Sequence, residues 1–236
     1  MFFFNFKRRL CDSGLFQGFT DAHCHLLPGV DDGVQSLDES LAILSRFQQL
    51  GIREVWLTPH VMEDVPNATA ALRERFASLT AAYRGPVVLH LAAEYMLDSL
   101  FHERLLSGDL LPWGPTGNRL LVETSFVHAP VNVHDLLRGI QSRGYFPLLA
   151  HPERYLYMNP LEFRALKQQG VEFQLNVFSL FGFYGYRVRE NARFLLEEGL
   201  YSCAGTDLHA LAHLEPALQQ KLRRKAIEAI RGMGRK

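Results

Sequence analysis

The 236 residues include 25 basic and 25 acidic side chains, so the formal net charge is zero, and 47% of the residues are hydrophobic. This is the composition of a globular protein with enough chain to bury one large core. A balanced charge gives no bulk attraction to nucleic acid, so we expect no nucleic-acid partner. The three cysteines lack the number and the spacing of a disulfide framework, which indicates a reducing compartment.

The start of the chain differs from the rest, and we expect a loose tail over residues 1–18 followed by one domain over residues 19–236. The tail opens on aromatic residues followed by basic ones: Phe2, Phe3, Phe4, Phe6, Lys7, Arg8 and Arg9. This is not the order of a signal peptide, and no stretch approaches the roughly 20 apolar residues of a membrane span, so we expect a cytoplasmic protein. Aromatic side chains beside basic ones suit peripheral contact with an anionic membrane, and a tail that is packed or disordered is the alternative.

Short apolar runs alternate with amphipathic segments from about residue 19 to the end of the chain. The runs are apolar on both faces, which is typical of buried parallel strands. We expect strands over residues 19–24, 52–58, 86–93, 119–123, 145–150, 171–177 and 201–205.

Helical patterns fall between these runs. The first begins at Ser36-Leu37-Asp38-Glu39, a capping-box sequence in which the Ser hydroxyl and the Glu carboxylate satisfy free backbone N–H groups, and Gly51 suits its end. Further helices are expected over residues 69–83, 131–143, 161–169, 187–198 and 215–231. Strand and helix alternate about seven times, which predicts an α/β fold with a parallel sheet, either closed as a barrel or open and doubly wound.

Residues of the types that bind metals stand at the carboxyl ends of most predicted strands. In chain order they are His23, His25, His60, Glu94, Glu123, His151, Asp207 and His209. The carboxyl ends of the strands of an α/β barrel form one rim, which is where active sites assemble. His23 and His25 alternate on an extended strand and point to one face, so Cys24 points away and is not expected to bind metal.

Imidazole and carboxylate ligands without thiolates suit Mn²⁺, Fe²⁺ or Zn²⁺. A carboxylate such as Glu94 or Glu123 can bridge two cations. Two cations can clamp the attacking and leaving oxygens of a displacement at phosphorus and lower the pKa of bound water toward about 7. The pattern therefore predicts a metal-dependent phosphoester hydrolase, and an ordinary polar rim is the alternative.

Several motifs resemble those of known families. Four are similar to motifs of the PHP (polymerase and histidinol phosphatase) superfamily: Asp21-Ala22-His23-Cys24-His25, Thr58-Pro59-His60, His151-Pro152-Glu153-Arg154 and Thr206-Asp207-Leu208-His209. Three more resemble the manganese-dependent bacterial tyrosine phosphatases of the CpsB/YwqE type: Leu26-Leu27-Pro28-Gly29-Val30-Asp31-Asp32-Gly33, Ala93-Glu94-Tyr95-Met96-Leu97-Asp98 and Leu180-Phe181-Gly182-Phe183-Tyr184-Gly185. The motifs occur in family order over residues 21–209.

The resemblance implies a distorted (β/α)7 TIM-like barrel, the PHP fold, in a single domain with three divalent metal ions. The implied ligands of the first ion are His23, His25, Glu94 and Asp207. Those of the second are Glu94, Glu123 and His151, with Glu94 bridging, and those of the third are Asp32, His60 and His209. Manganese is the implied metal, while iron and zinc stay open because they share these ligands.

The resemblance also implies an activity, namely hydrolysis of phosphotyrosine on the tail of a membrane-associated tyrosine autokinase that controls capsule or exopolysaccharide synthesis. A metal-activated hydroxide would attack phosphorus, and the implied phosphate-gripping residue is Arg154, whose planar fork suits phosphate oxygens. Asp207 or His209 could protonate the leaving group, and Arg187 is a further candidate for substrate binding. Val177 and Phe178 replace the small residues common in the family, so the shape of the pocket wall, and with it the substrate preference, can differ from that of the family.

Three alternatives stay open. A small-molecule phosphatase such as histidinol-phosphate phosphatase uses the same fold and would be favoured by a deep pocket. A polymerase-associated exonuclease module is disfavoured by the zero net charge. A non-catalytic binding module on a decayed barrel is disfavoured because every ligand-type position is intact, and metal analysis would decide it.

Overall fold

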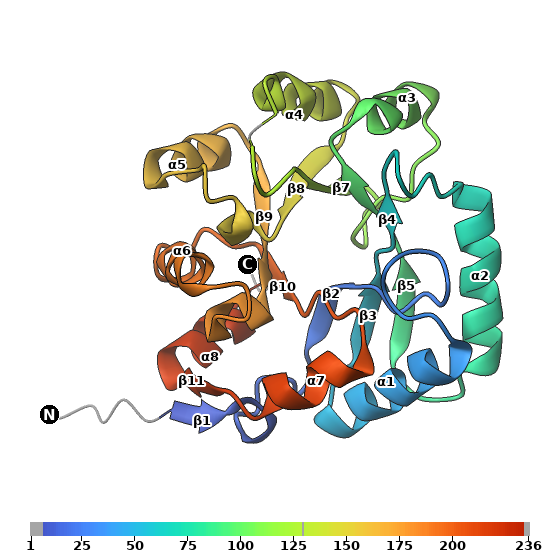
Figure 1. Ribbon diagram of the computed structural model, residues 1–236, viewed down its shortest axis with the longest axis vertical. Coiled ribbons are helices and arrows are strands. Elements are labelled where there is room, and N and C mark those ends of the chain that lie inside the picture. Colours follow the sequence, from blue (N-terminus) through green and yellow to red (C-terminus); the bar gives the residue numbers. More distant parts are fainter. Residues whose placement is uncertain (1–6, 129, 234–236) are drawn as a thin grey trace, which may run out of the picture.

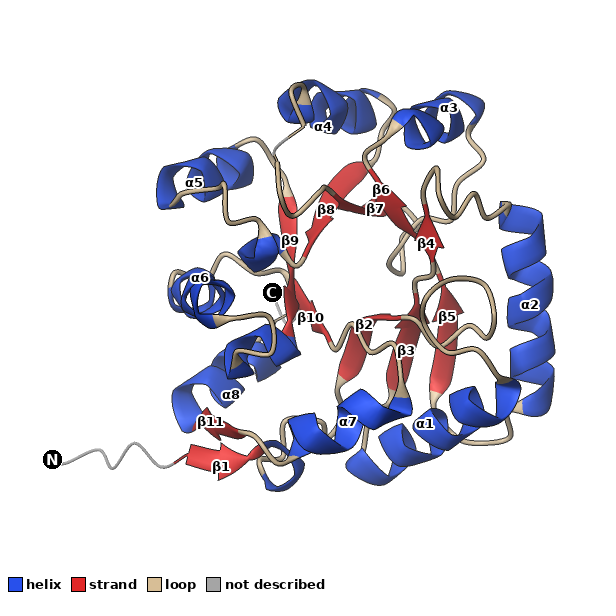
Figure 2. Ribbon diagram, in the orientation of Figure 1, coloured by secondary structure: helices blue, strands red, loops and turns tan. Residues whose placement is uncertain are grey.

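The computed structural model describes residues 7–128 and 130–233. In this part of the chain, parallel strands form two curled sheets, one of six strands in the order β10-β9-β8-β7-β6-β4 and one of three in the order β2-β3-β5 (Figure 2). The strands are β2 Thr20–Cys24, β3 Glu54–Leu57, β4 His60–Val61, β5 Val88–Leu91, β6 Glu94–Met96, β7 Arg119–Glu123, β8 Phe146–Ala150, β9 Glu172–Asn176 and β10 Cys203–Gly205.

The helices lie around the outside of the two sheets, so the chain is a mixed α/β protein of one domain (Figure 1). They are α1 Leu37–Leu50, α2 Thr69–Ala82, α3 Ser99–Ser107, α4 Val133–Ser142, α5 Pro160–Gln168, α6 Tyr186–Glu197, α7 Leu211–Leu218 and α8 Arg224–Arg231. Short 3-10 helices cover Leu10–Asp12, Pro152–Arg154 and Val177–Phe181. None of the helices in the described residues has an apolar stretch of the length that a membrane crossing requires.

All seven expected strands are present, but the structure adds short strands and α3 that the sequence reading did not predict. β4 and β6 follow β3 and β5 after brief interruptions, and they pair with each other rather than continuing the three-stranded sheet. Pro59 stands between β3 and β4, and because proline has no N–H to donate, a β-ladder is readily interrupted there.

The start of α1 is only half of the predicted capping box. The Ser36 hydroxyl accepts a hydrogen bond from the Glu39 backbone N–H, and Gly51 ends the helix with a φ of 88°. The Glu39 carboxylate, however, accepts a hydrogen bond from the Leu211 N–H at 3.0 Å. The Glu39 side chain therefore ties α1 to the start of α7 instead of closing its own helix.

The prediction of one helix over residues 215–231 is wrong. α7 ends at Leu218, and Lys221–Arg223 forms strand β11, which pairs antiparallel with β1, Lys7–Arg9. The prediction of a loose tail over residues 1–18 is also wrong for its described part, because Leu10, Leu15 and Phe16 are buried. The phenylalanines expected to contact a membrane lie at residues 2–6, outside the described residues.

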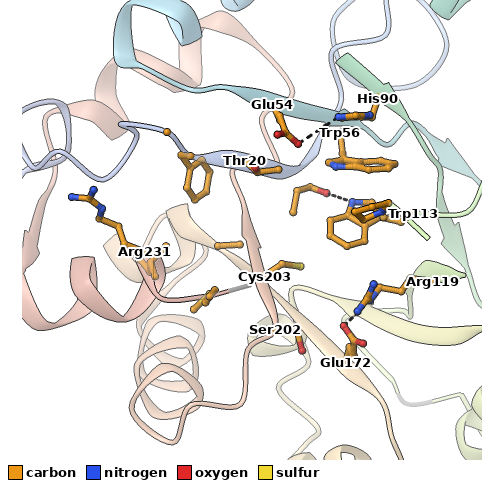
Figure 3. Close-up of a pocket in the computed structure, with 18 of the residues that line it drawn as sticks. Thr20, Glu54, Trp56, His90, Trp113, Arg119, Glu172, Ser202, Cys203 and Arg231 are labelled. Atoms are coloured by element: carbon orange, nitrogen blue, oxygen red, sulfur yellow. Dashed lines mark hydrogen bonds and ion pairs between the residues drawn. The ribbon is translucent and has the colours of Figure 1, made fainter. Parts of the chain in front are cut away.

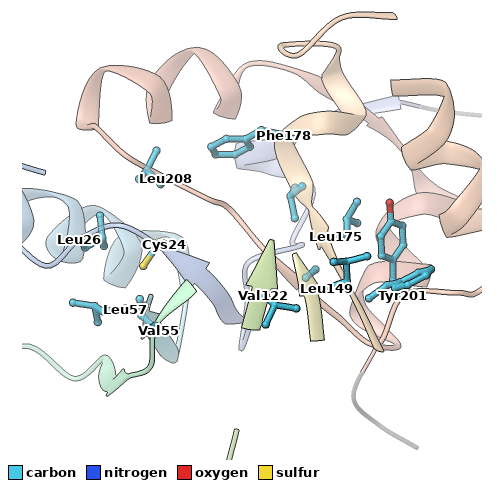
Figure 4. Packing of buried hydrophobic residues seen from close by; sticks show 14 of the residues in the cluster. Cys24, Leu26, Val55, Leu57, Val122, Leu149, Leu175, Phe178, Tyr201 and Leu208 are labelled. Carbon is cyan, nitrogen blue, oxygen red and sulfur yellow. The ribbon is translucent and has the colours of Figure 1, made fainter. Parts of the chain in front are cut away.

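Apolar side chains fill two layers. The outer layer packs between the sheets and the helices and includes Cys24, Val55, Leu57 and Leu149 (Figure 4). The smaller inner layer lies on the concave side of the sheets and consists of Ala22, Trp56, Ala92, Trp113, Leu121, Leu148 and Ala150. Cys24 packs in the outer layer, and in the described residues it belongs to none of the possible metal-holding groups.

Candidate active site

A cavity of about 790 Å³ lies at the carboxyl ends of the parallel strands. Its walls include most of the candidate ligands predicted from the sequence: Asp32, His60, Glu94, Glu123, His151, Asp207 and His209. His23 and His25 are completely buried beside them. Arg154 also lines this cavity, between the ligand-type side chains and apolar residues such as Phe126 and Phe183. The strand topology has therefore gathered residues from the whole chain at one rim.

The backbone of β2 is irregular where it delivers the first two histidines. Asp21 pairs with Val55 and Cys24 with Leu57, so β2 contains one residue more than its partner between these points. A bulge of this kind re-aims the side chains next to it. The backbone carbonyl of His23 then accepts a hydrogen bond from the Asp207 N–H at 2.8 Å, which brings the β2 and β10 segments together.

Hydrogen bonds fix the protonation of both buried imidazoles. His23 Nδ1 lies 3.0 Å from Gln174 Oε1, and His25 Nδ1 lies 2.8 Å from Asp31 Oδ2. Both partner atoms are acceptors, so Nδ1 carries the proton in each ring and Nε2 presents a lone pair. Neither Gln174 nor Asp31 was predicted from the sequence. Metal sites regularly contain residues that orient a metal-binding imidazole in this way. The signal that could have identified Asp31 was its position next to the predicted ligand Asp32.

Four candidate ligand atoms converge at one buried point. The Nε2 atoms of His23 and His25 are 3.0 Å apart, and Glu94 Oε2 and Asp207 Oδ1 lie 3.2–3.5 Å from them. Burial disfavours a charge on His23, yet Glu94 and Asp207 outweigh this effect and raise its pKa to about 9. The point where these atoms meet therefore attracts positive charge, and its nitrogen and oxygen donors fit a divalent metal ion.

Glu94 connects this group to the next. Its Oε1 lies 2.9 Å from His151 Nε2, and its Oε2 lies 3.2 Å from His60 Nδ1, which is also 3.2 Å from Glu123 Oε1. Glu94 is completely buried, and although burial opposes its charge, His23 and His60 hold its pKa well below the usual range. A fully buried carboxylate among imidazoles is placed to bridge two cations.

A third group lies toward the mouth of the cavity. Asp32 Oδ1 is 3.5 Å from both His60 Nε2 and His209 Nε2, and the His25 and His209 rings stack with centroids 3.9 Å apart. The possible metal-holding groups overlap, and each has its ligand atoms within 4.8 Å of one another. Together they contain all nine predicted ligands: His23, His25, Asp32, His60, Glu94, Glu123, His151, Asp207 and His209. Their role as ligands stays a prediction.

The backbone is strained at two of these residues. His151 has a φ of 34° and Asp207 a φ of 53°, in the left-handed region that costs a non-glycine residue about 1–3 kcal/mol. Gly205 precedes this turn, and a Cβ atom there would lie 2.6 Å from the backbone nitrogen of His23. The close approach of β10 to the bulge in β2 therefore requires glycine at this position.

The two predicted substrate-binding arginines have different positions. Arg154 Nη1 donates to Asp207 Oδ2 at 3.2 Å, and the same carboxylate oxygen accepts a hydrogen bond from Asn176 Nδ2 at 2.8 Å. Arg187 is exposed, donates to the Leu156 carbonyl oxygen at 3.3 Å and is not part of the cavity wall. The structure thus brings Arg154 to the ligand-type residues and leaves Arg187 outside them.

The family model for capsular polysaccharide synthesis, CpsB/CapC, matches residues 19–231. The chain belongs to the CpsB/CapC family. Its relatives in this family include the tyrosine-protein phosphatase YwqE of Bacillus subtilis, 30% identical over 80% of this chain and 76% of that protein. Another is the tyrosine-protein phosphatase CpsB of Streptococcus pneumoniae, 30% identical over 85% of this chain and 86% of that protein.

A solved structure supports the same relationship. It comes from crystal structures of YwqE from Bacillus subtilis and CpsB from Streptococcus pneumoniae, described as unique metal-dependent tyrosine phosphatases. The match has a TM-score of 0.74 and 28% sequence identity, and it covers 82% of this chain and 80% of the other. The CpsB/CapC fold therefore extends over the strands that carry the ligand-type residues.

This CpsB/CapC chain has a second cavity of about 810 Å³ at the amino ends of its strands (Figure 3). Trp56 and Trp113 form part of its wall, and the Trp113 N–H donates to the Ala22 carbonyl oxygen at 2.9 Å. Arg119 and Glu172, which also line this cavity, form an ion pair with Nε and Oε2 2.9 Å apart. In the described residues, none of the possible metal-holding groups lies at this cavity.

Proposed function

We propose that this chain is a metal-dependent protein-tyrosine phosphatase. The observation that carries the proposal is the convergence of His23, His25, Glu94 and Asp207, whose buried nitrogen and oxygen atoms meet beside Arg154. Membership of the CpsB/CapC family and the similarity to YwqE and CpsB support the same activity.

The proposed cofactors are three divalent ions, with manganese favoured and iron or zinc able to use the same ligands. His23, His25, Glu94 and Asp207 would hold the first ion; Glu94, Glu123 and His151 the second; and Asp32, His60 and His209 the third. The overlapping groups of side chains support the first and third sets, whereas in the second set Glu123 groups with Glu94 and His60, and His151 groups with Glu94 and His23.

The finer fold that we propose is a distorted (β/α)7 barrel. Hydrogen bonds that join the two sheets support it, since Asp207 N–H donates to the His23 carbonyl and His25 N–H donates to the Leu208 carbonyl. Both links lie at candidate ligands. Closure of the barrel would therefore hold the ligands from the two sheets at a fixed separation.

The chemistry divides between the ions and the chain. Bound cations would neutralise phosphate charge and supply a water of lowered pKa. Arg154 would hold the phosphate oxygens through its planar fork, and Asp207 or His209 would donate a proton to the leaving group. The apolar side of the cavity, which includes Phe178 and Phe183, suits the phenyl ring of phosphotyrosine.

The proposed substrate is a phosphotyrosine protein, the tail of a membrane-associated tyrosine autokinase that controls capsule or exopolysaccharide synthesis. In this proposal the enzyme meets that tail in the cytoplasm. Arg187 at the surface would contact acidic residues of the phosphoprotein, and residues 2–6 would give peripheral contact with the membrane. The exposure of Arg187 outside the cavity wall agrees with contact to a protein rather than to the phosphate itself.

The test is hydrolysis of p-nitrophenyl phosphate, a phosphotyrosine peptide and histidinol phosphate by the full chain. Chelation with EDTA should abolish turnover and Mn²⁺ should restore it, with the highest kcat/KM on the phosphotyrosine peptide. Full activity in chelator would contradict the metal requirement. A higher kcat/KM on histidinol phosphate would replace the protein substrate with a small molecule.

A further inference from the structure

Arg154 belongs to a stack of planar side chains that the proposed chemistry does not account for. Its guanidinium carbon lies 3.9 Å from the ring centroid of Phe126 and 4.6 Å from that of Tyr184. Phe126 is nearly parallel to Tyr155, with centroids 6.0 Å apart and an interplanar angle of 17°. Tyr155 is in turn nearly parallel to Tyr157, at 5.8 Å and 22°. We call these five side chains the Arg154 stack.

The inner part of the Arg154 stack is fixed to the sheet. Tyr155 is completely buried, its hydroxyl donates to the Ala150 carbonyl oxygen at 2.9 Å, and the same hydroxyl accepts a hydrogen bond from the Thr124 N–H at 3.2 Å. Ala150 ends β8 and Thr124 follows β7, so two adjacent strands hold this ring. Phe126 therefore packs between a ring held by two hydrogen bonds and the guanidinium group of Arg154.

Contact with ring faces can orient a guanidinium without occupying its N–H groups. A guanidinium has five N–H donors, and within the described residues only Nη1 of Arg154 has a hydrogen-bond acceptor, Asp207 Oδ2. The remaining donors are free for oxygens in the cavity that Arg154 lines. Arginine stacks on aromatic faces through its planar charge, so the rings restrict the tilt of the fork while its edge stays available.

We propose that Phe126 is a positioning residue that sets the plane of the Arg154 fork for a phosphate group. The proposal rests on the proposed function, in which Arg154 binds the phosphate. Phe126 acts through Arg154 and not by contact with the aromatic ring of the substrate. It therefore affects every phosphate ligand of the site, including inorganic phosphate, which has no ring.

The experiment compares Phe126→Leu and Phe126→Tyr with the wild-type manganese-loaded enzyme. Phe126→Leu should lower kcat/KM for p-nitrophenyl phosphate about tenfold and raise the inhibition constant of inorganic phosphate by a similar factor, because a misplaced fork weakens both interactions. Phe126→Tyr keeps the ring face and should restore both values to within about twofold. Phe194→Leu is the matched control, since Phe194 carries the guanidinium of Arg164 at 5.4 Å on another part of the surface, and it should change neither value.

A double-mutant cycle separates the possible failures. In an Arg154→Ala background, Phe126→Leu should have no further effect on the inhibition constant of phosphate. A tenfold weaker phosphate inhibition on adding Phe126→Leu to Arg154→Ala would overturn the positioning role. So would a Phe126→Leu variant that is inhibited normally by phosphate and has only a higher KM for the aryl substrate. Arg154→Ala with unchanged phosphate inhibition would instead contradict the phosphate-binding role of Arg154 in the proposed function.

Discussion

The cavities at the two ends of the parallel strands are similar in size, about 790 Å³ at the carboxyl ends and about 810 Å³ at the amino ends. At the amino ends, Arg119 pairs with Glu172 and the Trp113 indole N–H has an acceptor. At the carboxyl ends, Glu94 Oε2 and the Nε2 atoms of His23 and His25 lie within 3.4 Å of one another.

The difference teaches that the kinds of polar group in the walls, rather than the size of the cavity, distinguish the two ends. Buried polar groups normally have partners, because an unpaired one costs free energy. At the amino-end cavity, Arg119 pairs with Glu172, and His90 Nε2, which has no hydrogen bond, lies 3.5 Å from Glu54 Oε2. The carboxyl-end site gathers nine imidazole and carboxylate side chains, an arrangement that bound cations would satisfy.

Replacement of Glu94 by Gln should have the largest effect. The variant keeps the shape of the side chain but removes the carboxylate that contacts His23, His60 and His151. Activity should fall by more than the roughly 100-fold that loss of an outer partner of a metal ligand costs. Steady-state kinetics on p-nitrophenyl phosphate with excess Mn²⁺ measures the loss, and activity within tenfold of wild type would remove Glu94 from the centre of the site.

Replacement of Trp56 by Ala tests the amino end. Trp56 is 8% exposed and lies 5.1 Å from Trp113 between ring centroids, so the variant should lose about 3–5 kcal/mol of stability. Urea unfolding in the presence of EDTA measures this change without a contribution from metal binding. The folded variant should retain the wild-type metal content. Loss of metal from a folded Trp56→Ala protein would show that the two ends are not independent.

Replacement of Asp31 by Asn should have the smallest of the three effects. The variant weakens the acceptor that holds the proton on His25 Nδ1, so manganese affinity should fall about 10–100-fold while saturating Mn²⁺ restores most of the activity. A titration against a competing chelator gives the affinity. Asp64→Asn, at an exposed residue, is the control. Equal affinities for the two variants would mean that Asp31 does not orient the imidazole.

Eight of the nine candidate ligands could be predicted because their meeting place follows from topology, whereas Asp32 was expected only from the family resemblance. Once apolar runs such as residues 119–123 and 145–150 are assigned to parallel strands, the residues after them lie at one rim. The separation of Cys24 from His23 and His25 follows from the alternation of a strand. These inferences need only the order of the elements and the direction of the strands.

The supporting structure could not be predicted in this way. The bulge in β2 depends on its register with β3, and the role of Gln174 depends on how close β9 lies to β2. Phe126 reads as an ordinary loop residue until Arg154 is placed against it. β11 was hidden within an apparently continuous helical pattern, because its pairing with Lys7–Arg9 joins opposite ends of the chain.

The most direct test of the account is elemental analysis of the full chain after incubation with Mn²⁺ and removal of free metal. The account predicts three ions per chain for the wild type and for Trp56→Ala, with fewer for Glu94→Gln. A folded wild-type protein that retains no manganese, iron or zinc under any loading condition would contradict it.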